Sequence, residues 1–146
     1  MNAKDLMIGN WVYYTKKSQF PMQVVSIGDN YVYLDFEGNE GDVFEPTLEE
    51  IQPIEVREEI LQNSGFEKDE EFLPVGETRT KEPYFILSAE EYDFYFKKTY
   101  KNNDTYWCLN VSDNYLLSRS TFYIKYVHEI QNILRLITGK DLEVKL

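Results

Sequence analysis

The chain has one histidine, His128, and this is the side chain best suited to acid–base or metal chemistry at neutral pH. It lies in the segment YVHEIQNILRLITGKDLEV, residues 126–144. On a helix, a second metal ligand would stand three or four residues later, where the chain has the poor zinc ligands Gln131 and Asn132. Glu129 points about 100° away on a helix and cannot orient the ring. The spacing therefore indicates a structural or surface role for His128.

The lone cysteine, Cys108, lies between Trp107 and Leu109 in a predicted strand. No basic residue within three positions would stabilise a thiolate, so we expect a buried, structural thiol. A single cysteine also excludes an internal disulfide and a multi-cysteine zinc site. The seven glycines are scattered and none precedes a Lys-Ser or Lys-Thr pair, so the sequence contains no phosphate-binding loop.

Acidic side chains occur in two patterns that resemble sites. Asp35, Glu37 and Asn39 alternate like the first ligands of a calcium-binding loop. Glu40 takes the place of the loop's glycine and Pro46 that of its bidentate glutamate, so the motif fails. Adjacent glutamates point apart on a helix or a strand and do not form a catalytic pair. These pairs are Glu49-Glu50, Glu58-Glu59, Glu70-Glu71 and Glu90-Glu91. We therefore predict no catalytic residue, no metal site and no cofactor, and we expect that the protein is not an enzyme.

The charge of the chain is unevenly distributed. The 146 residues include 15 basic and 26 acidic side chains, a net charge of −11. Residues 1–55 carry −7 and residues 56–91 carry −6, whereas residues 92–146 carry +2. Nonspecific nucleic-acid binding requires clustered basic side chains. We therefore expect no nucleic-acid binding except weak binding through residues 92–125. The basic residues there are Lys97, Lys98, Lys101, Arg119 and Lys125.

Composition indicates a folded, aromatic-rich protein, with 42% hydrophobic and 16% aromatic residues. The N-terminus MNAKDLMIGNW lacks a secretion signal, and no stretch approaches membrane-spanning length. We therefore expect a cytoplasmic protein without membrane contact. The oligomeric state stays open, and the aromatic content fits a homodimer as well as a monomer.

The first part of the chain predicts short strands separated by turns, which is typical of an SH3-like small β-barrel. The expected strands are NWVYY (10–14), FPMQVVSI (20–27), YVYLDF (31–36), VFEP (43–46) and LEEIQPI (48–54). Residues 1–55 are therefore expected to form a barrel subdomain.

Residues 56–146 are expected to form an α+β subdomain, joined with the barrel in one compact unit. VREEILQNSGF (56–66) predicts a linking helix that Gly65 ends in a left-handed conformation. Residues 67–83 are charged and contain Pro and Gly, which indicates an exposed loop or a ragged hairpin. Over 88–100, a capping box favours helix and the aromatic alternation favours strand. We favour a hairpin within an antiparallel sheet of about three strands.

Apolar residues at helical spacing predict an amphipathic helix over 124–138. Its apolar side is expected to pack against the antiparallel sheet, with His128 facing away. Gly139 is expected to end the helix in a left-handed conformation, and DLEVKL (141–146) to follow as a short strand.

An interaction surface is expected from aromatic side chains of the barrel and polar side chains of the last helix. Small barrels present aromatic grooves and exposed strand edges to their partners. The residues of this expected surface are Trp11, Tyr13, Tyr14, Tyr31, Tyr33, His128, Gln131, Asn132 and Arg135. The sequence therefore favours a non-catalytic protein-interaction module.

Three blocks of the chain carry a family resemblance. They are LMIGNWVYY (6–14), PI-x-V-x-EEIL-x-x-x-GF (53–66) and YVHEIQN-x-x-x-x-x-TGKDLEV (126–144). In this order the chain resembles a family of small uncharacterised proteins of Bacteroides-type gut bacteria and their phages. The resemblance implies a mobile-element or phage origin but no activity, substrate or site residue. Two alternative functions stay open. A phage origin and the charge of −11 suit an acidic decoy of a DNA-binding protein. The C-terminal aromatic and lysine side chains suit a single-stranded nucleic-acid binder.

Overall fold

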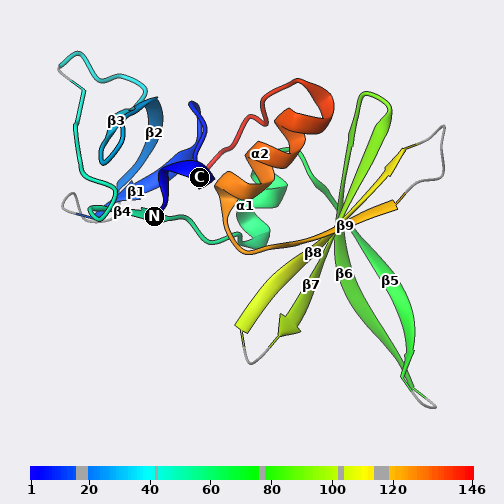
Figure 1. The fold of residues 1–146 in the computed structure, drawn as a ribbon. Helices are drawn as coiled ribbons and strands as arrows, with labels where there is room; N and C mark the ends of the chain where they lie inside the picture. Colours follow the sequence, from blue (N-terminus) through cyan, green and yellow to red (C-terminus); the bar gives the residue numbers. More distant parts are fainter. Residues whose placement is uncertain (16–19, 42, 76–77, 102–103, 114–118) are drawn as a thin grey trace. The chain divides into compact units, whose positions relative to one another are not determined.

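The computed structural model describes all residues except 16–19, 42, 76–77, 102–103 and 114–118 (Figure 1). In chain order its elements are the 3-10 helix η1 (Ala3–Asp5), the strands β1 (Trp11–Tyr14), β2 (Phe20–Ile27), β3 (Val32–Asp35) and β4 (Ile51–Pro53), the helix α1 (Glu58–Asn63), the strands β5 (Glu67–Val75), β6 (Thr78–Ala89), β7 (Tyr92–Lys101), β8 (Asp104–Asp113) and β9 (Arg119–Ile124), and the helix α2 (Val127–Thr138). Two antiparallel sheets and two α-helices among these residues confirm the predicted α+β class.

The chain divides into two compact units. Unit 1 comprises residues 1–55, 126–144 and 146, and unit 2 comprises residues 56–125 and 145. The helix α2 therefore belongs to the same unit as the N-terminal strands.

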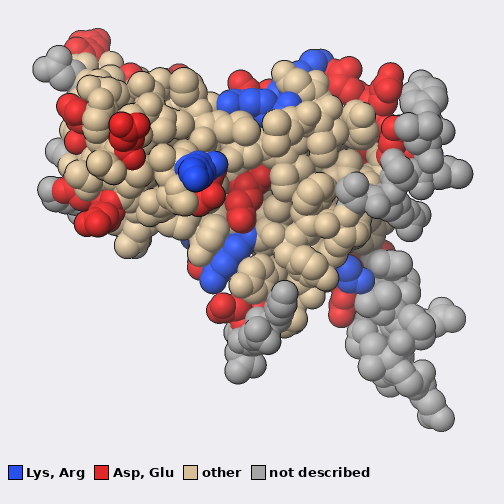
Figure 2. All heavy atoms as spheres, in the orientation of Figure 1, with Lys and Arg blue, Asp and Glu red and all other residues tan. Residues whose placement is uncertain are grey.

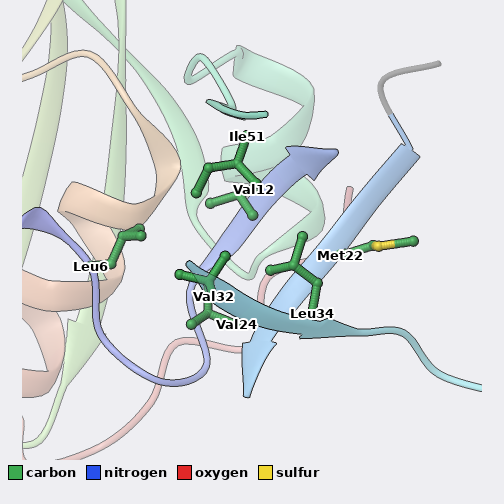
Figure 3. Packing of buried hydrophobic residues seen from close by; sticks show 7 residues of the cluster. All are labelled: Leu6, Val12, Met22, Val24, Val32, Leu34 and Ile51. Atoms are coloured by element: carbon green, nitrogen blue, oxygen red, sulfur yellow. The ribbon is translucent and has the colours of Figure 1, made fainter. Parts of the chain in front are cut away.

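Unit 1 contains a four-stranded antiparallel sheet with the strand order β3-β2-β1-β4. Alternate residues of its strands are buried, as expected when one face of a sheet covers a core. The core cluster of the sheet consists of Leu6, Val12, Met22, Val24, Val32, Leu34 and Ile51 (Figure 3). The opposite face, here called the outer face, carries the side chains that alternate with the core residues.

A closed SH3-like barrel is not confirmed, because the described residues form open sheets whose edge strands do not pair with each other. The expected strand 43–46 is reduced to isolated bridges beside β3. There Phe44 pairs with Leu34 and Thr47 pairs with Tyr31. These bridges hydrogen-bond the edge of β3 that does not pair with β2. They do not continue to β4, so the sheet stays open.

Unit 2 contains a five-stranded antiparallel meander with the strand order β5-β6-β7-β8-β9. The sheet is larger than expected because residues 67–83 contribute strands: β5 pairs with β6 from Glu67 opposite Ile86 to Val75 opposite Thr78. The exposed-loop prediction was wrong, and the hairpin alternative is confirmed. An edge strand pairs on one side only, so solvent accommodates the charges near the start of β5.

The ambiguity over 88–100 is resolved in favour of strand. β6 runs to Ala89, Glu90 reverses the chain with a positive φ of 57°, and β7 starts at Tyr92. The predicted hairpin of β7 and β8 is confirmed. β8 continues to Asp113, and residue 114 lies outside the described residues.

The core of unit 2 lies on one sheet face, where residues that flank α1 contact it. Phe85, Phe96 and Leu109 are opposite one another in neighbouring strands and are fully buried. Phe66 packs edge-to-face on Phe96 with 5.1 Å between ring centroids, and the indole N–H of Trp107 donates to the carbonyl of Val56. The side chains that alternate with these core residues along the strands lie on the other sheet face.

Both helix ends expected at glycine are confirmed. Gly65 follows α1 with φ of 92°, and Gly139 caps α2 with φ of 71°, conformations that glycine adopts without a steric penalty. α2 starts at Val127, later than expected, because β9 extends to Ile124. The strand expected at 141–146 was wrong: these residues are irregular, and Val144 is buried against the fold.

Candidate interaction surface

The polar side chains of α2 contact the N-terminal segment, defined as residues 5–11, which runs from the end of η1 to the first residue of β1. Gln131 is buried, with 5% of its surface exposed. Its Oε1 accepts from the backbone N–H of Trp11 at 3.0 Å, and its Nε2 donates to the carbonyl of Gly9 at 3.1 Å. Gln131 therefore pairs the backbone N–H of Trp11, which lies just before the register of β1 with β4 begins, and the carbonyl of Gly9.

Asn132 continues this pattern one residue later. Its Oδ1 accepts from Nδ2 of Asn10 at 2.8 Å, and its Nδ2 donates to the carbonyl of Asp5 at 2.9 Å. Asn10 is fully buried and also accepts from the backbone N–H of Met7 at 2.7 Å. The two asparagines thus hold the turn before β1 from inside unit 1.

Arg135 contacts the same segment through its guanidinium group. Nη1 donates to the carbonyl of Ile8 at 2.6 Å, and Nε is paired with the carboxylate of Asp141. Gly9 has φ of 92°, and a Cβ atom there would lie 2.7 Å from Nη2 of Arg135. Gln131, Asn132 and Arg135 together form what we call the polar clasp on the N-terminal segment.

His128 was expected on the exposed side of the helix, and this prediction was wrong. The side chain is buried, with 5% of its surface exposed, and its ring stacks on Tyr126 at 5.8 Å and 10°. Its buried Nδ1 has no hydrogen-bond partner among the described residues. Burial lowers the pKa of His128 below its usual value, while the charges of Glu129 and Asp5 oppose this shift. A neutral, structural imidazole follows.

The aromatic residues of β1 point to opposite faces of the sheet. Tyr14 lies on the core side, where its ring is 6.0 Å from Phe44. Trp11 and Tyr13 lie on the outer face and are partly exposed. Strand alternation therefore separates Tyr14 from the two aromatic neighbours with which it was grouped.

Tyr31 and Tyr33 form a second aromatic group, here called the tyrosine pair. Their rings are 5.5 Å apart at 82°, and 38% of the Tyr31 surface is exposed. The charge of Glu45, followed by burial and Tyr31, raises the Tyr33 pKa above its usual value. The pair thus lies close to the negative charge of Glu45.

Charge is concentrated in unit 1. It contains 13 acidic and 5 basic side chains, a net charge of −8, whereas unit 2 carries −3. Residues 29–50 include eight acidic side chains and no basic one. Figure 2 shows acidic groups spread over the visible face, with smaller basic groups among them. The tyrosine pair therefore lies in the most acidic part of the chain.

The residues that suggested chemistry are not assembled into a site. Across the described part of the chain, no three His, Cys, Asp or Glu side chains are placed to hold a metal ion. Cys108 is half-buried rather than buried as expected, and its Sγ is 3.7 Å from Nδ2 of Asn110. It lies on the sheet face opposite the core of unit 2.

Sequence reasoning missed three residues of these arrangements: Asn10, Gly28 and Glu45. Asn10 and Glu45 were expected only as members of the strands 10–14 and 43–46, and Gly28 lies in the turn between the strands expected at 20–27 and 31–36. The signal available was the proximity of Gly28 and Tyr31 in a tight turn, which permits the ring to fold back onto the glycine.

No family model, curated protein or solved structure is significantly similar to this chain. Among the described residues, no helix has both the length and the apolar character needed to cross a membrane. The fold and the geometry of its side chains therefore carry the functional argument.

Proposed function

We propose that the protein is a non-catalytic protein-interaction module that binds a basic partner through the outer face of unit 1. The observation that carries this proposal is the coincidence of partly exposed aromatic side chains and negative charge. Trp11, Tyr13 and Tyr33 share the outer face, and the unit has a net charge of −8. Aromatic rings supply contact area at low entropic cost, and complementary charge accelerates association.

The same chemistry supports the acidic decoy of a DNA-binding protein as one form of this function, since such a partner is basic. The family resemblance and a phage or mobile-element origin are compatible with it and stay part of the proposal, as does a cytoplasmic location. We also propose an SH3-like relationship for unit 1, supported by its short, strongly paired strands and by the bridges at the edge of β3.

The test is a binding comparison by NMR and fluorescence anisotropy with three probes: an oligo-arginine peptide, an oligo-glutamate peptide and a single-stranded oligonucleotide. We expect salt-sensitive binding of the arginine peptide alone, with shifts at Trp11, Tyr13 and neighbouring residues of unit 1. Absence of binding to the basic peptide, or shifts confined to unit 2, would contradict the proposal.

Single-stranded nucleic-acid binding is a second candidate, favoured by the sheet face of unit 2 opposite its core. Tyr84, Lys97, Cys108 and Tyr123 form one row across this face, and Tyr95 lies in the next row. Aromatic rings on a sheet stack on unpaired bases. Lys97 is 3.4 Å from Glu82, which reduces the available positive charge and places this candidate second.

Strand alternation provides a matched pair of variants for this candidate. Lys97 lies on the tyrosine-bearing face, whereas Lys98 is opposite Trp107 on the core side and is exposed. If the oligonucleotide binds, Lys97→Ala should weaken its binding more than Lys98→Ala in a mobility-shift assay. Equal effects of the two variants would contradict recognition by this face.

A further inference from the structure

The tyrosine pair offers two aromatic rings at nearly a right angle. The ring centroids of Tyr31 and Tyr33 are 5.5 Å apart, and the interplanar angle is 82°. Perpendicular rings present a face and an edge side by side, and the face of an aromatic ring attracts cations. With 38% of Tyr31 exposed, the pair is open to a ligand from solvent.

Gly28 fixes the position of the Tyr31 ring. A Cβ atom on Gly28 would lie 2.6 Å from Cζ of Tyr31 and 2.8 Å from Cε2, so the ring lies directly against the glycine backbone. The N–H of Gly28 also donates to the carbonyl of Tyr31 at 2.9 Å, which closes the turn. The ring is therefore held before any ligand arrives, which lowers the entropic cost of binding.

Glu45 is held beside the pair by the backbone on both of its sides. The N–H groups of Leu34 and Val32 donate to the carbonyls of Phe44 at 2.7 Å and Pro46 at 3.0 Å. Glu45 lies between these two anchored residues, opposite Tyr33 in the register set by the bridges of Leu34 with Phe44 and of Tyr31 with Thr47, and its side chain is exposed. The backbone of Glu45 is thus held beside Tyr33, and the carboxylate is close enough to raise the pKa of the Tyr33 hydroxyl.

We propose that Tyr31, Tyr33 and Glu45 form a recognition site for a lysine or arginine side chain of a partner polypeptide. This inference rests on the proposed function, because it names the group that the basic partner presents to unit 1. A cation at this site is attracted by the aromatic faces and by the carboxylate together. The eight acidic and zero basic residues within 29–50 favour this occupant over an anionic one.

The first test compares two carboxylate variants in binding to oligo-arginine and oligo-lysine peptides. Glu45→Gln removes the carboxylate at the site, and Glu37→Gln removes an exposed carboxylate from the same acidic stretch. We expect Glu45→Gln to weaken binding about fivefold and Glu37→Gln by less than about twofold. Comparison of the two peptides decides between guanidinium and ammonium recognition.

Ring variants distinguish a cation–π contact from general hydrophobic contact. Tyr31→Phe retains the ring and should bind within about twofold of the unmodified protein, whereas Tyr31→Leu should lose about threefold or more in affinity. Gly28→Ala should weaken binding like Tyr31→Leu, because the added methyl group displaces the ring. Circular dichroism of each variant establishes that unit 1 is folded.

The outcomes separate this inference from the function on which it rests. Equal effects of Glu45→Gln and Glu37→Gln, or equal binding by Tyr31→Phe and Tyr31→Leu, would overturn the recognition site while leaving a basic partner for unit 1. Failure of both cationic peptides to bind the unmodified protein would overturn the function and the site together.

Discussion

The polar clasp and the tyrosine pair belong to the same unit, and both were expected at its surface. The clasp side chains hydrogen-bond the backbone, whereas the tyrosine pair is partly exposed. Gln131 and Asn132 turn toward the backbone of the N-terminal segment. Tyr31 stays partly exposed beside β3. The difference depends on which backbone needs partners. The N-terminal segment lies largely outside the sheet and requires side chains to pair its polar groups, whereas β3 is hydrogen-bonded along both edges.

This comparison explains why a polar helix face is weak evidence for a binding surface. Amide side chains carry both a donor and an acceptor, so they can replace the missing ladder partners of an irregular segment. Tyrosine side chains beside a strand whose backbone is already hydrogen-bonded are not needed to pair backbone groups. Exposed aromatic side chains on completed secondary structure are therefore the better indicator of a partner.

The largest expected effect comes from removing the central amide of the polar clasp. Gln131→Ala leaves the N–H of Trp11 without its partner and should reduce the free energy of unfolding by about 3 kcal/mol. Gln62→Ala, at an exposed position next to the end of α1, should change it by less than about 0.5 kcal/mol. Urea unfolding measures both. Similar losses of unfolding free energy in the two variants would contradict a structural role for Gln131 that an exposed glutamine does not have.

A smaller effect is expected from the glycine under the clasp. Gly9→Ala and Gly38→Ala both place alanine at a positive φ, but only Gly9 also faces a guanidinium nitrogen at 2.7 Å. Moving Arg135 would break its contacts with Ile8 and Asp141. Gly9→Ala should therefore be more destabilising than Gly38→Ala, by about 1 to 2 kcal/mol in chemical denaturation. Equal stability of the two variants would show that Arg135 moves freely.

Acidification should weaken unit 1 through His128. Its pKa is lowered in the folded protein from the ordinary value of 6.5, so the unfolded chain binds more protons as the pH falls below that value. Stability is full above the unfolded pKa and decreases as the pH falls from there toward the folded pKa. Urea unfolding between about pH 7.5 and 5.5 should show this slope, and His128→Phe should reduce it. An unchanged slope in the variant would assign the effect to other groups.

The smallest effect concerns the tyrosine pair, which should alter titration and leave stability nearly unchanged. The pKa of Tyr33 is raised above 10.0, mainly by the charge of Glu45. Glu45→Gln should lower this pKa toward its ordinary value, as followed by the NMR shifts of the Tyr33 ring at alkaline pH. Its free energy of unfolding should change by less than about 0.5 kcal/mol. A large loss of stability would give Glu45 a structural role like that of the clasp.

Features that depend on local conformation were readable from the sequence. The strands expected at 20–27 and 31–36, the aromatic alternation of β7, and the glycine stops at Gly65 and Gly139 all matched the structure. Each follows from the preferences of a few neighbouring residues. The five-stranded size of the second sheet was not readable, because the charged strand β5 is formed through its pairing with β6.

The sequence by itself determined the α+β class, the positions of most strands, both helix ends and the concentration of acid in residues 29–50. Tertiary structure decided the burial of His128 and the inward turn of Gln131 and Asn132. Asn10 and Asn132 are 122 positions apart, and no local pattern identifies which distant backbone groups lack partners. Whether a side chain is polar is set by its residue type, but whether it finds hydrogen-bond partners depends on the whole fold.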